Sequence, residues 1–212
     1  RAVNTVWNTQ KCFASFVERG LVYRSKKPVY WSIPCQTALA EAEVEHLEKR
    51  STAIWVAFPV PNPASHGITA AHPLSVVIWT TTPWTLPANR GIAVHPAFDY
   101  VLVEALTHAG KERLLVAEGL LESVMATAGI TTYRVLGHCL GQALEHLNTR
   151  HPFIERHAPI ALAEYVTLDA GTGCVHTAPG HGVDDYHTGC RYGWPVDHPV
   201  MDNGCYREDT PI

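Results

Sequence analysis

Several features that would place this sequence in a specialised class are missing from it. None of its six cysteines forms a C-x-x-C pair, and a chain of 212 residues can build a core without disulfide staples. No apolar run approaches the ~18–20 residues that a membrane-spanning helix needs, and no secretory signal pattern is visible. We therefore expect reduced, mostly buried thiols and no membrane partner. We also expect a cytoplasmic location, with an organellar matrix left open.

Positive charge is also scarce. The formal net charge of −4 argues against a protein that grips nucleic acid over a broad basic face, although contact with a single-stranded RNA end stays open. The apolar fraction of 46% is typical of a globular protein with a real core. The chain opens at Arg1 in the middle of a helical pattern and stops at Ile212 without a capping element, so we expect a piece of a longer polypeptide.

The apolar pattern predicts many short strands and few helices. A helix-like stripe over residues 3–19 ends at Gly20, where a C-terminal cap belongs. Strands dominate without βαβ alternation, so we expect an α+β fold with a mixed β-sheet or small β-barrel core and surrounding short helices. Residues 1–45 are predicted to form a connecting helix/strand segment, and residues 46–212 the main domain. Strands are predicted at 28–31, 52–58, 74–79, 91–94, 100–104, 114–117, 131–136, 160–168 and 174–176, and further helices at 118–128, 140–147 and 184–192.

The first loop of interest follows the strand predicted at 74–79 and contains Thr80, Thr81 and Thr82. Branching at Cβ narrows the conformations of these residues, and Pro83 and Pro87 stiffen the following turn. A rigid shelf of hydroxyl and amide donors suits a site that holds an ester carbonyl or a water molecule. Ordinary threonine turn bonding at a strand end is the alternative interpretation, and spacing alone does not choose between them.

The second loop, residues 171–182, is rich in glycine and leads into a helix that begins near Gly182. Asp184 and Asp185 fall in the first turn of that helix, where the helix dipole favours a carboxylate by ~0.3–1 kcal/mol. One interpretation is that both aspartates only stabilise the helix start. The other is that one of them binds a cation such as the α-ammonium group of an amino acid.

Metal and phosphate chemistry are weaker interpretations of the same loop. His176, His181, Asp185 and His187 carry potential zinc ligands, but their spacing matches no pattern such as H-E-x-x-H. The glycine-rich run lacks the lysine of a P-loop and the G-x-G-x-x-G order. We predict no metal and no cofactor, and keep a metal-dependent hydrolase as an alternative.

Taken together, the two loops resemble the signature segments of the editing domain (CP1) of isoleucyl-tRNA synthetases of the bacterial and organellar type, which are class I aminoacyl-tRNA synthetases. Valine-specific relatives typically carry arginine and glutamate after the first two threonines, where this chain has Thr82, Pro83 and Trp84. The resemblance makes residues 46–212 the editing domain. The matching runs fall in family order at residues 20–24, 27–32, 37–45, 79–89, 171–182, 185–186, 192–193, 195–196 and 199–200.

The resemblance implies hydrolytic proofreading: water attacks the aminoacyl ester of valyl-tRNA(Ile), and valyl-adenylate is a further substrate to consider. No segment like the His-Ile-Gly-His or Lys-Met-Ser-Lys-Ser motifs of the ATP site occurs, so we expect no amino-acid activation. Relatives often carry a zinc-binding cysteine pair near residues 31–37, where this chain has only Cys35. A non-catalytic module that binds the tRNA 3′ end is a second alternative.

The resemblance also assigns site residues. Asp185 would bind the α-ammonium group, and Thr80, Thr81 and Thr82 would hold the terminal ribose, the ester and the attacking water. The remaining assignments are Trp84 and Asn89 lining the adenosine and amino-acid ends of the pocket, and His176 bordering the side-chain pocket. The expected partners are the aminoacylated 3′ end of tRNA(Ile) with its misactivated valine moiety and the rest of the synthetase chain, and we expect a monomer.

Overall fold

The computed structural model describes residues 2–68 and 72–212, except for the side chains of residues 2–4. Its α-helices are α1 (Ala2–Glu18), α2 (Leu121–Thr127) and α3 (Val183–Tyr192). The strands are β1 (Trp31–Ser32), β2 (Thr37–Ala38), β3 (Ile54–Pro59), β4 (Leu74–Thr80), β5 (Gly91–Val94), β6 (Asp99–Thr107), β7 (Gly110–Ala117), β8 (Tyr133–Leu140), β9 (Asn148–Arg150), β10 (His157–Leu162) and β11 (Cys174–Thr177). Short 3₁₀ helices are η1 (Glu41–Glu43), η2 (Pro63–His66), η3 (Pro83–Ala88), η4 (Glu118–Leu120) and η5 (Gly141–Leu144).

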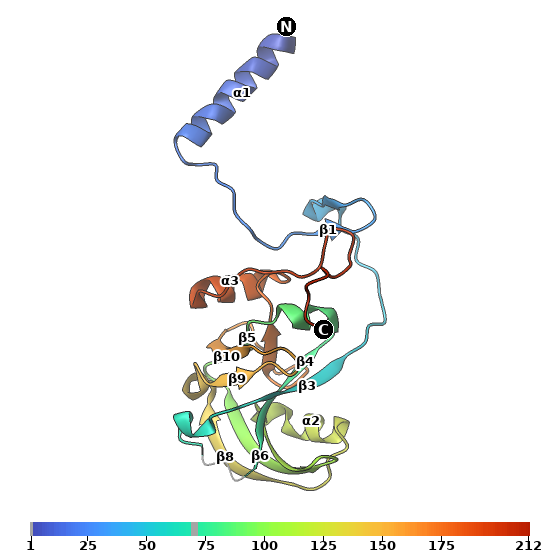
Figure 1. Cartoon of the computed structure of the whole chain (residues 1–212), viewed down its shortest axis with the longest axis vertical. Helices are drawn as coiled ribbons and strands as arrows, with labels where there is room; N and C mark the ends of the chain where they lie inside the picture. Colours follow the sequence, from blue (N-terminus) through green and yellow to red (C-terminus); the bar gives the residue numbers. More distant parts are fainter. Residues whose placement is uncertain (1, 69–71) are drawn as a thin grey trace.

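One mixed sheet forms the body of the molecule and curls into a half-barrel (Figure 1). Its strands follow the order β8-β6-β7-β4-β11-β5-β10-β9, with β3 added along β4. The β4–β7, β4–β11 and β5–β10 pairs are parallel, and the other pairs of this sheet are antiparallel. The predicted α+β fold with a mixed sheet and short helices is therefore confirmed.

The core lies inside the curl and includes Tyr100, which is fully buried. Its hydroxyl accepts a hydrogen bond from the His95 backbone N–H (3.0 Å) and donates one to the Gly173 carbonyl (2.6 Å), so its polar atom is satisfied. Gly173 has a φ of +72°, and a Cβ there would lie 2.3 Å from the Ala117 side chain. These contacts hold the chain that enters β11, and thus one side of the site described below.

The N-terminal part of the chain lies apart from the sheet. Helix α1 projects away from the body and ends as predicted, with Gly20 at a φ of +69° (Figure 1). The β1–β2 hairpin contacts the C-terminal segment through a hydrogen bond from the Trp31 indole N–H to the Asp202 carbonyl (2.9 Å). Within the described parts of the chain, no helix combines the length and apolarity that crossing a membrane requires.

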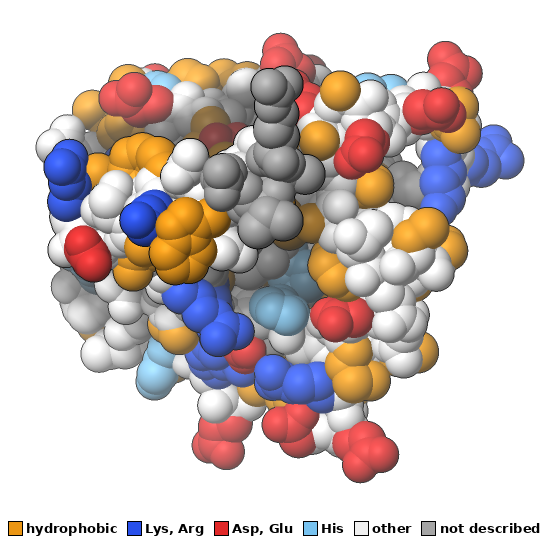
Figure 2. All heavy atoms as spheres, turned by 90° about the horizontal axis from the view of Figure 1, so that it is seen from above, with side chains coloured by type: hydrophobic (Ala, Val, Ile, Leu, Met, Phe, Trp, Pro, Cys, Tyr) orange, Lys and Arg blue, Asp and Glu red, His pale blue; other side chains and the backbone are white. Residues whose placement is uncertain are grey.

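Charge is mixed on the end of the molecule that Figure 2 shows. Basic and acidic side chains are interspersed on this face, and histidine is visible near its centre. This mixture agrees with the small formal net charge of −4.

Three predictions of local structure and one of thiol burial were wrong. Of the strand expected at 28–31, only Trp31 lies in a strand, the two-residue β1 that pairs with β2. The strand expected at 160–168 ends at Leu162, after which the chain turns and packs Val166 near Ala93. The helix expected at 140–147 is the short η5, because Gly141 lies against the His95 carbonyl, and the unpredicted β9 follows. The thiols are free, but only Cys174 is buried, and four of the six are exposed.

Candidate active site

The two predicted loops line one cavity of about 630 Å³. Strand β11 runs parallel to the neighbouring strand β4, with Val175 opposite Trp79, so the loops that adjoin these two strands lie close together. All but one of the predicted site residues line this cavity, and the exception is Asn89. The predicted residues in its wall are Thr80, Thr81, Thr82, Trp84, His176 and Asp185.

The threonines form a bonded shelf at the end of β4. The backbone N–H of Thr82 donates to the Thr80 hydroxyl (3.1 Å), and the two hydroxyl oxygens lie 3.2 Å apart. Thr80 is buried, Thr81 is half-buried and Thr82 is exposed. The turn bonding that the sequence left as an alternative is present between Thr80 and Thr82, and all three threonines line the cavity.

The resemblance implied that Asn89 lines the pocket, but its side chain is fully buried and is absent from the lining of this cavity. Its amide nitrogen donates to the Gly91 carbonyl (2.8 Å) and to Nδ1 of His176 (2.7 Å). Nδ1 is therefore the acceptor, and the ring proton lies on Nε2. Nε2 of His176 therefore donates a hydrogen bond to the Thr85 hydroxyl (2.8 Å). The Thr85 hydroxyl in turn donates one to the Thr82 carbonyl (2.8 Å).

This arrangement keeps His176 neutral. Burial, with smaller contributions from His151 and His181, lowers the pKa of His176 to about 3. Both ring nitrogens are bonded within the protein, so His176 shapes the wall and has no free nitrogen for a metal or a proton. The alternative of a metal-dependent hydrolase thus loses one proposed ligand. The described residues contain no group of three or more His, Cys, Asp or Glu that could hold a metal ion.

Asp185 lies in the first turn of α3, as predicted, and one of its oxygens accepts a hydrogen bond from the Ala178 backbone N–H (2.8 Å). Burial raises the pKa of Asp185 to about 6, the Ala178 bond opposes that rise, and Asp184 adds to it. The described lining residues include Asp185 and Asp169 but no lysine or arginine. A cationic ligand would therefore supply the missing counter-charge and favour the ionised form.

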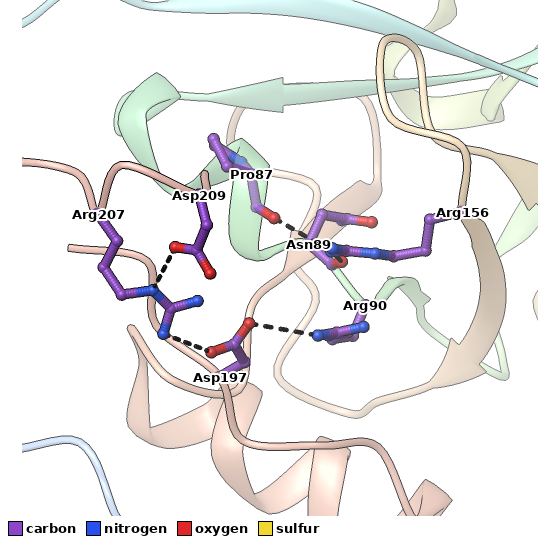
Figure 3. Close-up of polar contacts among 7 residues, drawn as sticks. All are labelled: Pro87, Asn89, Arg90, Arg156, Asp197, Arg207 and Asp209. Atoms are coloured by element: carbon purple, nitrogen blue, oxygen red, sulfur yellow. Dashed lines mark hydrogen bonds and ion pairs between the residues drawn. The ribbon is translucent and has the colours of Figure 1, made fainter. Parts of the chain in front are cut away.

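Sequence reasoning missed the side chains that hold the loop from behind. Arg156 donates to the carbonyls of Pro87 (3.1 Å) and Asn89 (2.9 Å), and His151 donates through Nε2 to the Leu86 carbonyl (2.9 Å) (Figure 3 shows the Arg156 bonds). Both donors precede β10, in a segment distant in sequence. No local motif marks such a contact, so the pattern of residues carried no signal for it.

An ion-pair chain then ties the C-terminal segment to the end of the loop. Asp197 bridges Arg90 (3.4 Å) and Arg207 (3.5 Å), and Arg207 also pairs with Asp209 (3.1 Å) (Figure 3). Tyr165 also lines the cavity and was missed, because the strand prediction ran through it. Burial raises the pKa of the Tyr165 hydroxyl.

Comparison with known proteins identifies the class. The family model described as tRNA synthetases class I (I, L, M and V) matches residues 3–191. The chain therefore belongs to this family of class I tRNA synthetases.

Relatives with similar sequences include isoleucine–tRNA ligases. The chain is 50% identical to an isoleucine–tRNA ligase of Nitrosococcus oceani over 208 residues, which cover 95% of this chain and 22% of that protein. It thus spans about a fifth of that relative's length. Among solved structures, it is similar to GlLeuRS-CP1 with a TM-score of 0.52 and 18% identity, over 68% of this chain and 66% of that one. It also matches the P. knowlesi cytosolic leucyl-tRNA synthetase editing domain with a TM-score of 0.54 and 14% identity, over 63% and 60% of the two chains. At these identities the structural matches establish the fold.

The hydrogen-bond chain through Asn89 predicts the protonation of His176. We expect nitrogen-15 NMR to find His176 neutral from pH 5 to pH 8, with its proton on Nε2, because burial and both ring bonds favour that form. Asn89→Ala should change the ring's nitrogen shifts, whereas Asn148→Ala, at an exposed position of β9, should not. A proton on Nδ1 in the parent protein would contradict this arrangement.

Proposed function

We propose that this chain is an editing domain that hydrolyses the aminoacyl ester of misacylated tRNA, with valyl-tRNA(Ile) as its substrate. The observation that carries the proposal is the pairing of a threonine shelf with Asp185 in a cavity that holds no described lysine or arginine. Such a cavity fits an ester that carries an α-ammonium group. Relatives named isoleucine–tRNA ligase and the fold of a leucyl-tRNA synthetase editing domain support the same proposal.

In this mechanism Asp185 anchors the ammonium group and thereby places the ester carbonyl beside the threonines. Hydroxyl and amide groups of Thr80, Thr81 and Thr82 hold the ribose and stabilise the oxyanion that forms when water attacks. Water is the nucleophile because the cavity offers no activated side chain. Burial raises the pKa of the Cys174 thiol, and His176 has both nitrogens engaged.

Selection against isoleucine is assigned to the wall that His176 forms. The ring is 6% exposed and is held on both sides, so it cannot yield easily to a larger side chain. A rigid wall excludes a side chain that is too large for the pocket. The site that attaches amino acids to tRNA discriminates poorly between substrates that differ by one methylene, so a second selection by size is needed.

The partners follow from this function. The 3′ end of tRNA(Ile) enters the cavity, and residues 1–45 connect residues 46–212 to the rest of a synthetase chain. Exposed apolar residues of α1, among them Trp7 and Phe13, suit a segment that packs against further protein. Valyl-adenylate would present the same ammonium group, and we propose a monomeric domain in a cytoplasmic or organellar compartment.

The ammonium anchor is tested with a neighbouring aspartate as control. Asp185→Asn should lower kcat/KM for valyl-tRNA(Ile) deacylation by about 10- to 100-fold, since a charged hydrogen bond is lost. Asp184→Asn removes the same charge from the exposed neighbouring position and should change the rate little. Deacylation is measured with and without a chelator.

The result separates three interpretations. If Asp185→Asn loses deacylation activity and the chelator does not change the activity of the parent, the result supports editing. Chelator-sensitive hydrolysis would identify a metal-dependent hydrolase instead. Binding of the tRNA end without hydrolysis would leave a binding module.

The raised pKa of Asp185 predicts an acidic limb in the pH profile. The ionised form binds the ammonium group, and a carboxyl group with a pKa of about 6 loses that form as the pH falls. We expect kcat/KM for the free domain to fall about tenfold between pH 7 and pH 5. The Asp185→Asn profile should be flat over this range, and a limb that persists in that variant would assign the titration to another group.

Removing the His176 wall should relax selection. We expect His176→Ala to increase deacylation of isoleucyl-tRNA(Ile) relative to valyl-tRNA(Ile), because the freed volume admits the larger side chain. The ratio of the two rates is the readout, since a general loss of folding lowers both. An unchanged ratio would contradict the assignment of the wall to His176.

A further inference from the structure

Asp197 contacts the second loop of the candidate active site and the residue that follows the first, without lining the cavity itself. Its carboxylate pairs with Arg90 (3.4 Å), directly after the first loop, and with Arg207 (3.5 Å) (Figure 3). Its backbone carbonyl packs against Gly180 in the second loop, where a Cβ would lie 2.3 Å from the carbonyl oxygen. One residue of the C-terminal segment therefore joins the two loops from outside the cavity.

The carboxylate of Asp197 lies among positive charges. Only 21% of the Arg90 side chain is exposed, and Asp197 is its sole ion-pair partner among the described residues. Burial and the neighbouring charge of Arg90 lower the pKa of Arg156, and Asp197 acts in the opposite direction. Partly buried charges are screened weakly, so the two guanidinium groups repel each other unless a carboxylate offsets the repulsion.

Arg156 connects this group of charges to the wall of the cavity. Its guanidinium group donates to the carbonyls of Pro87 (3.1 Å) and Asn89 (2.9 Å), at the end of the first loop. The Asn89 amide in turn donates to Nδ1 of His176 (2.7 Å). Displacing the guanidinium group from these carbonyls would loosen Asn89 and, through it, the histidine ring.

We propose that Asp197 is a positioning residue for the editing reaction. Its carboxylate keeps Arg90 and Arg156 in place, and Arg156 then holds Asn89 behind the histidine wall. The proposal rests on the proposed editing function, because selection against isoleucine is the task assigned to that wall. Asp197 touches neither the ester nor the water, so its removal changes the shape of the cavity and leaves the threonines and the ammonium anchor present.

The test uses Asp197→Asn, which keeps the size of the side chain and removes its charge. The ratio of isoleucyl-tRNA(Ile) to valyl-tRNA(Ile) deacylation should rise about tenfold, the lower end of what one methylene is worth in an apolar pocket. The KM for valyl-tRNA(Ile) should change by less than about twofold, because the ammonium anchor is retained. A merely structural role would lower both rates together and leave their ratio unchanged.

Two variants serve as controls for this substitution. Asp209→Asn removes a charge that pairs with Arg207 from a side chain that is 76% exposed, and it should leave the ratio unchanged. Asp197→Glu keeps the charge and should retain most of the selectivity. An unchanged ratio in Asp197→Asn, or an equal rise in Asp209→Asn, would overturn the proposal.

A second substitution tests the role of charge. Added to Asp197→Asn, Arg90→Gln removes the repulsion that acts on Arg156 and should restore part of the selectivity. Unfolding in urea is followed for each variant. If Asp197→Asn alone does not fold, recovery of folding in the double variant is the same rescue measured as stability. A double variant that is no better than Asp197→Asn in either measurement would contradict the proposal.

Nitrogen-15 NMR of the chain without substrate separates this proposal from the editing function. The Asn89 side-chain amide and the ring nitrogens of His176 should shift in Asp197→Asn and stay in place in Asp209→Asn. Such shifts in a chain that hydrolyses neither ester would support the positioning role while the editing function fails. Selective hydrolysis by the parent, with the ratio and the shifts unchanged in Asp197→Asn, would support editing and overturn the positioning role.

Discussion

The two hydrogen bonds that the buried Asn89 amide donates govern the geometry of the candidate site. One bond goes to the Gly91 carbonyl, and this contact orients the amide so that its second proton reaches Nδ1 of His176. The ring then holds its own proton on Nε2 and donates to Thr85, which in turn bonds the Thr82 carbonyl. A single buried amide thus connects the histidine wall to the threonine shelf, and its loss would remove the partner of the buried Nδ1 of His176.

The same loop is held from behind by groups that never reach the cavity. Arg156 binds the Pro87 and Asn89 carbonyls, and His151 binds the Leu86 carbonyl, which also accepts the Asn89 backbone N–H at the end of the 3₁₀ helix. Burial lowers the pKa of His151, which favours the neutral ring that accepts backbone bonds at Nδ1 while donating at Nε2. Preorganisation of this kind suits a mechanism that positions water and an already reactive ester instead of using a side-chain nucleophile.

Acidic and basic side chains occupy different places in and around the site. Asp185 is partly buried near the helix start and is not paired with a lysine or arginine in the described lining, so its carboxylate is poised for a cation. Basic side chains lie outside the cavity, where the ion pairs of Asp197 connect Arg90 and the C-terminal segment (Figure 3). These ion pairs tie the C-terminal segment to the residue that follows the first loop.

The sequence by itself determined the elements whose signals are local. Alternating and continuous apolar runs located most strands, Gly20 and Gly182 marked helix ends, and the two loop motifs contained most of the residues that line the cavity. Only the tertiary structure decided that Asn89 supports the wall and does not face the pocket, and that Arg156 and Tyr165 belong to the site. The physical reason is sequence distance: Asn89 bonds His176 across 87 positions and Arg156 bonds Asn89 across 67, and contacts of that range depend on how the sheet curls, which no local pattern records.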